Sequence, residues 1–197
     1  NLFKSWNLTV GKKIILLPGR LTAWKGQEMF LEALNKVNIQ LGNDAFIAVI
    51  LGNDQGRDLY KKKLIRLVEQ YRLTKQIRFI DHCKNMPLAY KISDIVISAS
   101  IEPEAFGRVS VEAQSMQKMI VASNLGGSNE TVIDGKTGIL FEAGNSDELS
   151  EKIIKVMNMD PNEISKMGNN GRENALKKFN VEKMCFSTYS EYKKLFN

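Results

Sequence analysis

With 197 residues, 43% of them hydrophobic, the chain is long enough to bury one hydrophobic core, and one domain is the expected number. The charged fraction of 25% is ordinary for a globular protein, which argues against a disordered chain. The net charge of +6 fits an anionic ligand or an acidic surface, and it fits a lysine-rich surface without a specific partner equally well. No apolar run approaches the roughly 20 residues of a membrane-spanning helix, and no signal peptide opens the chain.

The two cysteines, Cys83 and Cys185, lie far apart and show no paired spacing. Their usage fits a reducing compartment, so we expect a cytoplasmic protein, with the inner face of the membrane as an alternative location. His82 stands beside Cys83, but adjacent strand residues point to opposite faces, and no second pair accompanies them. We therefore expect no metal site.

Apolar runs of strand length alternate with helical patterns, which is typical of an α/β fold with a mostly parallel sheet flanked by helices. We expect strands at residues 14–17, 45–51, 77–80, 95–98 and 119–122, and a hairpin around 138–141. Between them the periodicity indicates helices near 30–41, from 59, near 88–91 and from 108, and three further helical stretches follow 142. In the last stretch an amphipathic packing helix is favoured by the apolar positions Cys185, Tyr189, Tyr192 and Phe196.

Ligands of such a fold bind at the carboxyl ends of the strands. The loop after the first strand contains Gly19, which permits a tight turn, and the cations Arg20 and Lys25. Two cations near the start of the next helix predict an anion site, for which a diphosphate is the obvious guest. A solvated loop with incidental charges explains this loop alone at least as well.

A second feature is a pair of glutamates, Glu104 and Glu112, with seven residues between them. In a continuous helix they would lie roughly 12 Å apart, which is too far for an acid and a base acting on one bond. The spacing suits two carboxylates that hold opposite ends of a polyhydroxyl ligand. We expect Glu104 in the loop before the helix, and Phe106, Gly107 and Arg108 at the helix start with free backbone N–H groups.

A third feature is the turn at Gly126 and Gly127, whose paired glycines let a backbone approach a ligand closely, although a purely structural turn explains them equally well. In this order, the three features resemble glycosyltransferase family four, whose members are retaining enzymes of the GT-B fold. The resemblance covers nearly the whole chain, including residues 89–100 and 134–141. The chain departs from the family in a longer loop at 52–56, and Ser128 and Asn129 replace the usual residues of the paired-glycine turn.

The resemblance implies a role for each motif residue. Arg20 and Lys25 would neutralise the diphosphate of a UDP-, GDP- or ADP-sugar, with Gly19 passing beneath the phosphates. Glu112 would bind the ribose and Glu104 the donor sugar, which makes Arg20, Lys25 and Glu104 the expected catalytic residues. The remaining contacts to sugar, phosphates and base would come from Phe106, Gly107, Arg108 and His82. No Asp-x-Asp pair occurs, so no metal cofactor is expected.

The resemblance also implies a division of the chain. Residues 1–9 would be the remnant of an interdomain linker, 10–180 the Rossmann-like donor-binding domain, and 181–197 a helix that packs toward a missing N-terminal acceptor domain. The expected acceptor is a saccharide or a lipid-linked sugar in bacterial envelope or polysaccharide synthesis, with peripheral membrane association left open.

Two alternatives stay open: another GT-B sugar enzyme, and a non-enzymatic nucleotide- or nucleic-acid-binding module. Basic and aromatic residues are not interleaved along one strand, so nucleic acid is not an expected partner.

Overall fold

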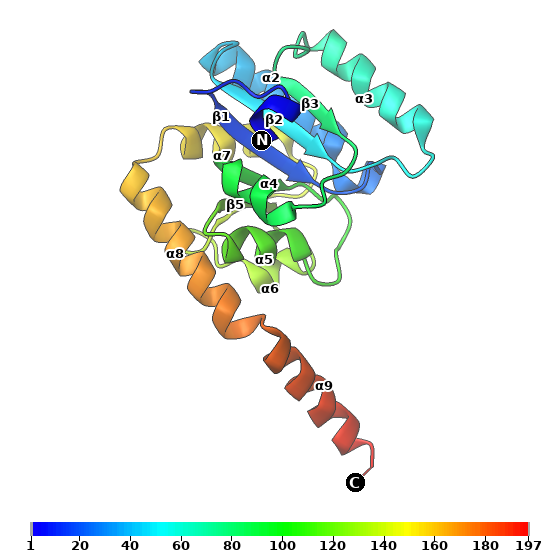
Figure 1. The fold of residues 1–197 in the computed structure, drawn as a ribbon, viewed down its shortest axis with the longest axis vertical. Helices are drawn as coiled ribbons and strands as arrows, with labels where there is room; N and C mark the ends of the chain where they lie inside the picture. Colours follow the sequence, from blue (N-terminus) through cyan, green and yellow to red (C-terminus); the bar gives the residue numbers. More distant parts are fainter. Residues whose placement is uncertain (1, 197) are drawn as a thin grey trace.

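The computed structural model describes residues 2–196, which build one six-stranded sheet with helices on both faces (Figure 1). The strands are β1 (Lys13–Pro18), β2 (Phe46–Leu51), β3 (Ile77–Ile80), β4 (Ile95–Ser98), β5 (Met119–Ser123) and β6 (Ile139–Phe141). They lie in the order β3-β2-β1-β4-β5-β6, and every neighbouring pair is parallel. This is the Rossmann-like strand order, so the expected fold class is confirmed.

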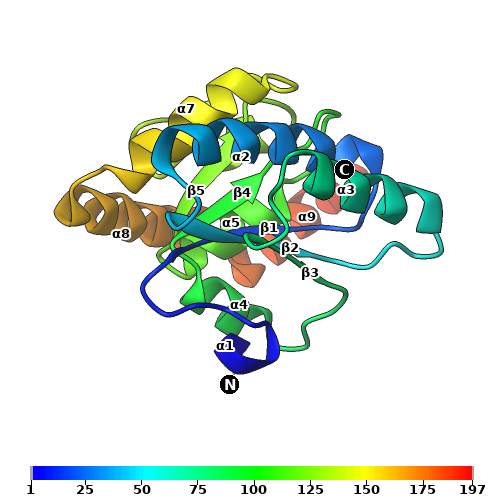
Figure 2. The same ribbon diagram turned by 90° about the horizontal axis from the view of Figure 1, so that it is seen from above.

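Ten helical segments connect and flank the strands within the described residues. They are α1 (Leu2–Ser5), the short 3₁₀ helix η1 (Ala23–Lys25), α2 (Gln27–Leu41), α3 (Asp58–Gln70), α4 (Met86–Ile92), α5 (Arg108–Ser115), α6 (Ser128–Thr131), α7 (Ser146–Met157), α8 (Pro161–Lys178) and α9 (Val181–Lys194). Figure 2 shows α2 and α7 on one side of the sheet and α1 and α4 on the other. Each face of the sheet therefore has its own hydrophobic layer.

Successive residues of a central strand pack alternately into the two layers. In β1, Ile15 and Leu17 pack with α2, α3 and α7, whereas Ile14 and Leu16 pack with α4 and α5. Because both faces are covered, β1 is almost continuously apolar instead of alternating with polar residues. Because such strands are continuous apolar segments, they can be located from the sequence.

The segment that was expected to form a hairpin is β6, and it pairs in parallel with β5 through Val121↔Ile139 and Ser123↔Phe141. The hairpin prediction is wrong. Between β5 and β6 the chain passes through α6 and returns to the starting end of the sheet before a tight turn, in which Gly135 N–H donates to the Gly138 carbonyl at 2.9 Å. A return of this kind makes the next strand parallel.

Helix α9 leaves the body of the domain as an arm (Figure 1). None of its residues is buried, and Tyr189 and Tyr192 are 66% and 61% exposed. The predicted helix exists and its apolar side is exposed, while its packing toward an N-terminal domain stays a prediction. Within residues 2–196 no other element supplies a surface that covers it.

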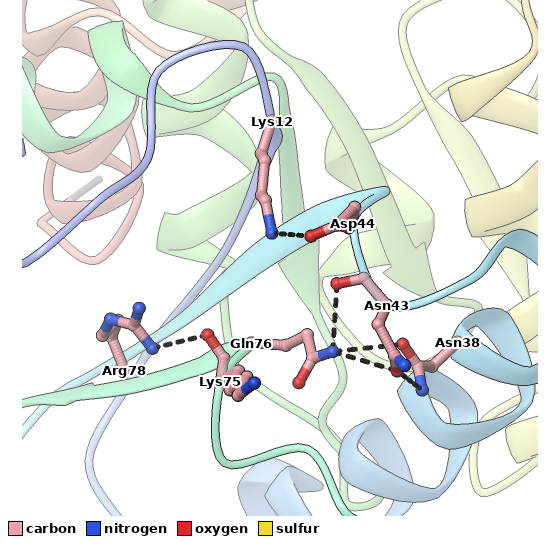
Figure 3. Close-up of polar contacts among 7 residues, drawn as sticks. All are labelled: Lys12, Asn38, Asn43, Asp44, Lys75, Gln76 and Arg78. Atoms are coloured by element: carbon pink, nitrogen blue, oxygen red, sulfur yellow. Dashed lines mark hydrogen bonds and ion pairs between the residues drawn. The ribbon is translucent and has the colours of Figure 1, made fainter.

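The amino ends of the strands are closed by polar contacts (Figure 3). Gln76 is only 2% exposed, and its Nε2 donates to the Asn43 carbonyl at 3.1 Å and lies 3.4 Å from Asn38 Oδ1. Nearby, Lys12 Nζ pairs with Asp44 Oδ1 at 2.6 Å. These contacts satisfy the Gln76 amide nitrogen but not its Oε1, which is buried without a hydrogen-bond partner among the described residues, and the loops able to form a site lie at the opposite, carboxyl edge.

Residues 2–9, expected to be a linker remnant, fold onto the domain. Trp6 is 6% exposed within the layer that contains α4 and α5. Arg78 Nε donates to the Asn7 carbonyl at 2.9 Å. The segment is thus part of the packed body, and its role as a link to another domain stays a prediction.

Candidate functional site

An open cavity of about 510 Å³ lies beyond the carboxyl ends of β1 and β4. At this point the strand order reverses, since β1 is followed on one side by β2 and on the other by β4. Crevices at such a switch point are the usual ligand sites of doubly wound sheets. Eight of the nine predicted site residues line the cavity: Gly19, Arg20, Lys25, Glu104, Phe106, Gly107, Arg108 and Glu112.

The floor of the cavity contains the ion pair between Lys25 and Glu104. Lys25 Nζ lies 2.8 Å from Glu104 Oε1, and the two side chains are 13% and 14% exposed. The Ser100 hydroxyl donates to the same carboxylate oxygen. The lysine stem passes close to Gly19 and places the ammonium 4.3 Å from the centre of the Trp24 ring. Lys25 is therefore held in place before any ligand binds.

A second cation–carboxylate pair stands at the other end of the cavity. Arg108 Nη2 donates to Glu112 Oε1 at 3.1 Å, one helical turn away on α5. The other oxygen, Oε2, accepts a hydrogen bond of 2.7 Å from the Tyr90 hydroxyl. Burial, followed by the bond to Glu112, raises the pKa of Tyr90 far above its ordinary value, so the phenol stays protonated and remains a donor.

The glycine after Lys25 fixes the path of the first loop. Gly26 has a φ of 72°, and a Cβ there would lie 1.9 Å from the Ala99 carbonyl oxygen. The loop is also held to the region after β4 by the Ile101 N–H, which donates to the Trp24 carbonyl at 2.8 Å. Because Gly26 allows this contact, the Lys-Gly pair brings the loops after β1 and β4 together.

The helix start that faces the cavity is that of α5, not that of α2. Gly107, Arg108 and Val109 line the cavity, whereas Gly26 and Glu28 border a separate hollow beside α3. The expectation that Arg20 and Lys25 act with the start of the next helix is corrected accordingly. The free N–H groups and the dipole of α5 are the ones directed at the site.

The paired glycines act as a support beneath the Glu104 loop. Gly127 N–H donates to the Glu104 carbonyl at 2.7 Å. A Cβ at Gly127 would lie 2.3 Å from the Phe106 carbonyl carbon, and one at Gly126 would lie 2.7 Å from the Glu104 nitrogen. Neither glycine lines the cavity. The structure therefore supports the structural interpretation of this turn, since the glycines allow a close approach to the Glu104 loop.

His82 is the predicted site residue that the cavity does not include. It is exposed in the loop after β3, and its assignment to the nucleotide base stays a prediction. Six further residues line the cavity without having been predicted as ligand contacts: Pro18, Trp24, Met86, Tyr90, Ala105 and Val109. Tyr90 gives no sequence signal because a buried aromatic on a helix is typical of a core.

Among residues 2–196, no group of three or more His, Cys, Asp or Glu side chains is arranged to hold a metal ion. In the same residues, no helix has both the length and the apolar character needed to cross a bilayer.

The strand order and the cavity at the switch point define a Rossmann-like α/β domain of the kind found in GT-B glycosyltransferases. The family model described as "Glycosyl transferases group 1" matches residues 1–174. The chain therefore belongs to the group 1 glycosyltransferase family.

Three solved structures illustrate the likeness. A glycosyltransferase from Rickettsia africae is 30% identical with a TM-score of 0.92, over 99% of this chain and 51% of that one. Anabaena HepE in complex with UDP-glucose is 26% identical with a TM-score of 0.89, over 98% of this chain and 51% of that one. The C-terminal domain of the Francisella tularensis group 1 protein LpcC is 29% identical with a TM-score of 0.79, over 92% of this chain and 94% of that one.

The chain spans less than half the length of curated relatives that it matches, at 35%, 43% and 49% of their residues.

Proposed function

We propose that the chain is the donor-binding, C-terminal half of a retaining glycosyltransferase and that its cavity binds a nucleoside diphosphate sugar. The observation that carries the proposal is the presence of two cation–carboxylate pairs, Lys25–Glu104 and Arg108–Glu112, in one cavity at the switch point. In such a ligand the phosphates would contact the two cations, and the hydroxyls would donate hydrogen bonds to the two carboxylates. The likeness to HepE, which was solved with UDP-glucose, supports the same class of ligand.

We assign each group in the cavity to one part of the donor. Arg20 and Lys25 stabilise the diphosphate, together with the α5 N-terminus and Arg108. Glu104 accepts hydrogen bonds from the donor sugar, and Glu112 accepts them from the ribose. At Glu112 the hydroxyls replace Arg108, which turns toward the phosphates, and at Glu104 they join Lys25 and Ser100, so no carboxylate is left without a partner.

The proposed reaction transfers the sugar with retention at the anomeric carbon. The acceptor hydroxyl attacks from the face that the diphosphate leaves, a bond from its oxygen to the anomeric carbon forms, and the bond to the phosphate oxygen breaks. The departing phosphate takes the acceptor proton. Cations that stabilise the charge growing on that phosphate are the main catalytic device, at about 3 to 4 kcal/mol for a well-placed group. No metal ion has a role in this scheme.

The acceptor belongs in this proposal to an N-terminal half outside the 197 residues, as in relatives about twice as long. Helix α9, whose apolar side is bare, is the segment that packs toward that half. The full enzyme acts on a saccharide or lipid-linked acceptor in bacterial envelope or polysaccharide synthesis, in the cytoplasm or at the inner membrane face. We expect these residues alone to bind the donor without sustained transfer.

Thermal unfolding in the presence of UDP-, GDP- and ADP-glucose tests the proposal. A ligand that binds only the folded state raises the unfolding temperature, by an amount that grows with its concentration relative to the dissociation constant. At least one of the three should stabilise the wild-type chain and the control Glu173→Ala, an exposed α8 residue outside the cavity. Glu112→Ala should lose the shift. No shift from any of the three, or an equal shift in Glu112→Ala, would contradict the proposal.

A further inference from the structure

The two partners of the Glu112 carboxylate differ in how firmly they are placed. Tyr90 is 2% exposed and lies in the hydrophobic layer beside α4, so its ring cannot move without disturbing that layer. Arg108, by contrast, has a side chain that is 82% exposed, at the rim of the cavity. One hydrogen bond to Glu112 is therefore fixed by packing, and the other comes from a side chain free to turn away.

The oxygens of Glu112 are divided between these partners. Oε2 accepts from the Tyr90 hydroxyl at 2.7 Å, and Oε1 accepts from Arg108 Nη2 at 3.1 Å. An exposed ion pair is weak and readily exchanged, because solvent screens both charges. A protonated phenol on a buried ring keeps donating to the carboxylate throughout. When Arg108 turns toward the phosphates, Oε1 becomes the free acceptor and Oε2 stays occupied.

We propose that Tyr90 is a positioning residue that holds Glu112 Oε1 toward the ribose hydroxyls and thereby makes the site prefer ribonucleotides over 2′-deoxyribonucleotides. The inference rests on the proposed function and adds a source of ligand selectivity to it. Glu112 is itself 38% exposed at its side chain and has rotatable bonds of its own. Without the phenol, the carboxylate turns between several orientations, and its contact with a 2′-hydroxyl weakens.

Isothermal titration of UDP, GDP and ADP, each beside its 2′-deoxy form, tests the inference. For the nucleotide that binds best, the wild-type chain should prefer the ribose form by about tenfold, the value expected for a hydrogen bond to a charged group. Tyr90→Phe keeps the ring and removes the hydroxyl. It should reduce the preference to about threefold or less and leave the affinity for the 2′-deoxy form within about twofold.

Tyr60→Phe is the matched control. Tyr60 is a half-buried tyrosine whose hydroxyl donates to Gln27 Oε1 at 3.2 Å, outside the cavity. This variant should retain the full ribose preference. A Tyr90→Phe chain that folds and keeps the wild-type preference would overturn the inference, as would equal wild-type binding of both forms. If the wild-type chain binds no nucleotide or nucleotide sugar, the proposed function itself fails. A role of Tyr90 in packing alone would weaken both forms equally, which also overturns the inference.

Discussion

Lys25 and Glu104 form the least exposed ion pair among residues 2–196, with side chains 13% and 14% exposed. Arg20, the other predicted catalytic cation, is exposed and makes no ion pair in the same residues. The two cations therefore differ in what they do before a ligand arrives. Lys25 neutralises a carboxylate that burial would otherwise penalise, whereas Arg20 stabilises no charged group of the described residues.

Replacing Lys25 should lower stability as well as donor binding. In Lys25→Met, Glu104 keeps only the Ser100 hydroxyl of its two partners, and we expect a loss of about 1 to 2 kcal/mol in the free energy of unfolding, less than for a fully buried pair. The double variant Lys25→Met, Glu104→Gln should lose less free energy of unfolding than Lys25→Met, since no unpaired charge remains. Urea denaturation measures both, with Arg20→Met as a control expected to stay within about 0.5 kcal/mol of wild type. A double variant less stable than Lys25→Met would contradict this account.

Lys118, immediately before β5, carries a charge at a cost to the fold. Burial first, and then the nearby Lys91, lower its pKa from 10.5, while Asp94 opposes the shift. Because the folded-state pKa is depressed, the protonated form is disfavoured in the fold. The resulting penalty is present at neutral pH and disappears as the pH rises through the lowered pKa toward 10.5.

Lys118→Met should therefore raise the unfolding temperature at pH 7, by about 2 °C or more. The advantage over wild type should shrink as the pH is raised to 10, because the lowered pKa lets the folded chain lose this proton more readily than the unfolded chain does. Calorimetry or circular dichroism at the two pH values measures this difference. An advantage that is the same at both pH values would show that the substitution acts through apolar packing alone.

At the scale of elements, the loop that carries Glu104 depends on a turn from another part of the chain. The paired glycines before α6 support it through one backbone hydrogen bond and through contacts that leave no room for side chains. The φ of Gly127 is −59°, so its backbone suits any residue and only the close approach to Phe106 demands glycine.

Gly127→Ala should thus destabilise the chain by crowding, by about 2 to 3 kcal/mol. It should also weaken donor binding, since the Phe106 backbone has to move and Glu104 moves with it. Chemical denaturation and titration with the stabilising nucleotide sugar measure the two effects. Asn129→Ala, at an exposed position in the short helix that follows Gly127, serves as the control and should change neither. Wild-type stability in Gly127→Ala would mean that the two loops are not packed as described.

At the scale of the whole molecule, the chain consists of a packed body and an arm. Helix α8 belongs to the body, because it buries Gly168, Gly171, Asn174 and Ala175, and Asn174 Nδ2 donates to Gln114 Oε1 at 2.9 Å. Helix α9 buries none of its residues. The break between the two helices lies near Phe179, whose ring meets that of Phe106 edge to face at 5.7 Å.

Removal of residues 181–197 should leave the unfolding temperature within about 2 °C of the intact chain, because little packing is lost. It should also reduce self-association, since exposed apolar side chains on α9 are removed. Differential scanning calorimetry and light scattering check both outcomes. Removal of residues 161–197 should, by comparison, unfold or severely destabilise the body. A large loss of stability on removing α9 alone would show that the helix packs on this domain after all.

The periodicity of single segments located much of this fold. Five strands and the helices between them follow from apolar runs and helical spacing, because a parallel sheet covered on both faces requires strands that are apolar throughout. The eight site residues that share the cavity lie after β1, before α5 and in the first turns of α5, and they come together since the carboxyl ends of parallel strands meet at one edge.

Contacts between distant segments decided the rest. The pairing of β6 with β5, the helix start directed at the cavity and the exposure of α9 depend on which surfaces meet, and a local pattern carries no such information. The same is true of Tyr90, whose hydroxyl matters only because α4 stands against α5. Residue type and spacing determined the kinds of chemistry available to this protein, and the tertiary structure determined which groups lie within hydrogen-bonding reach of one another.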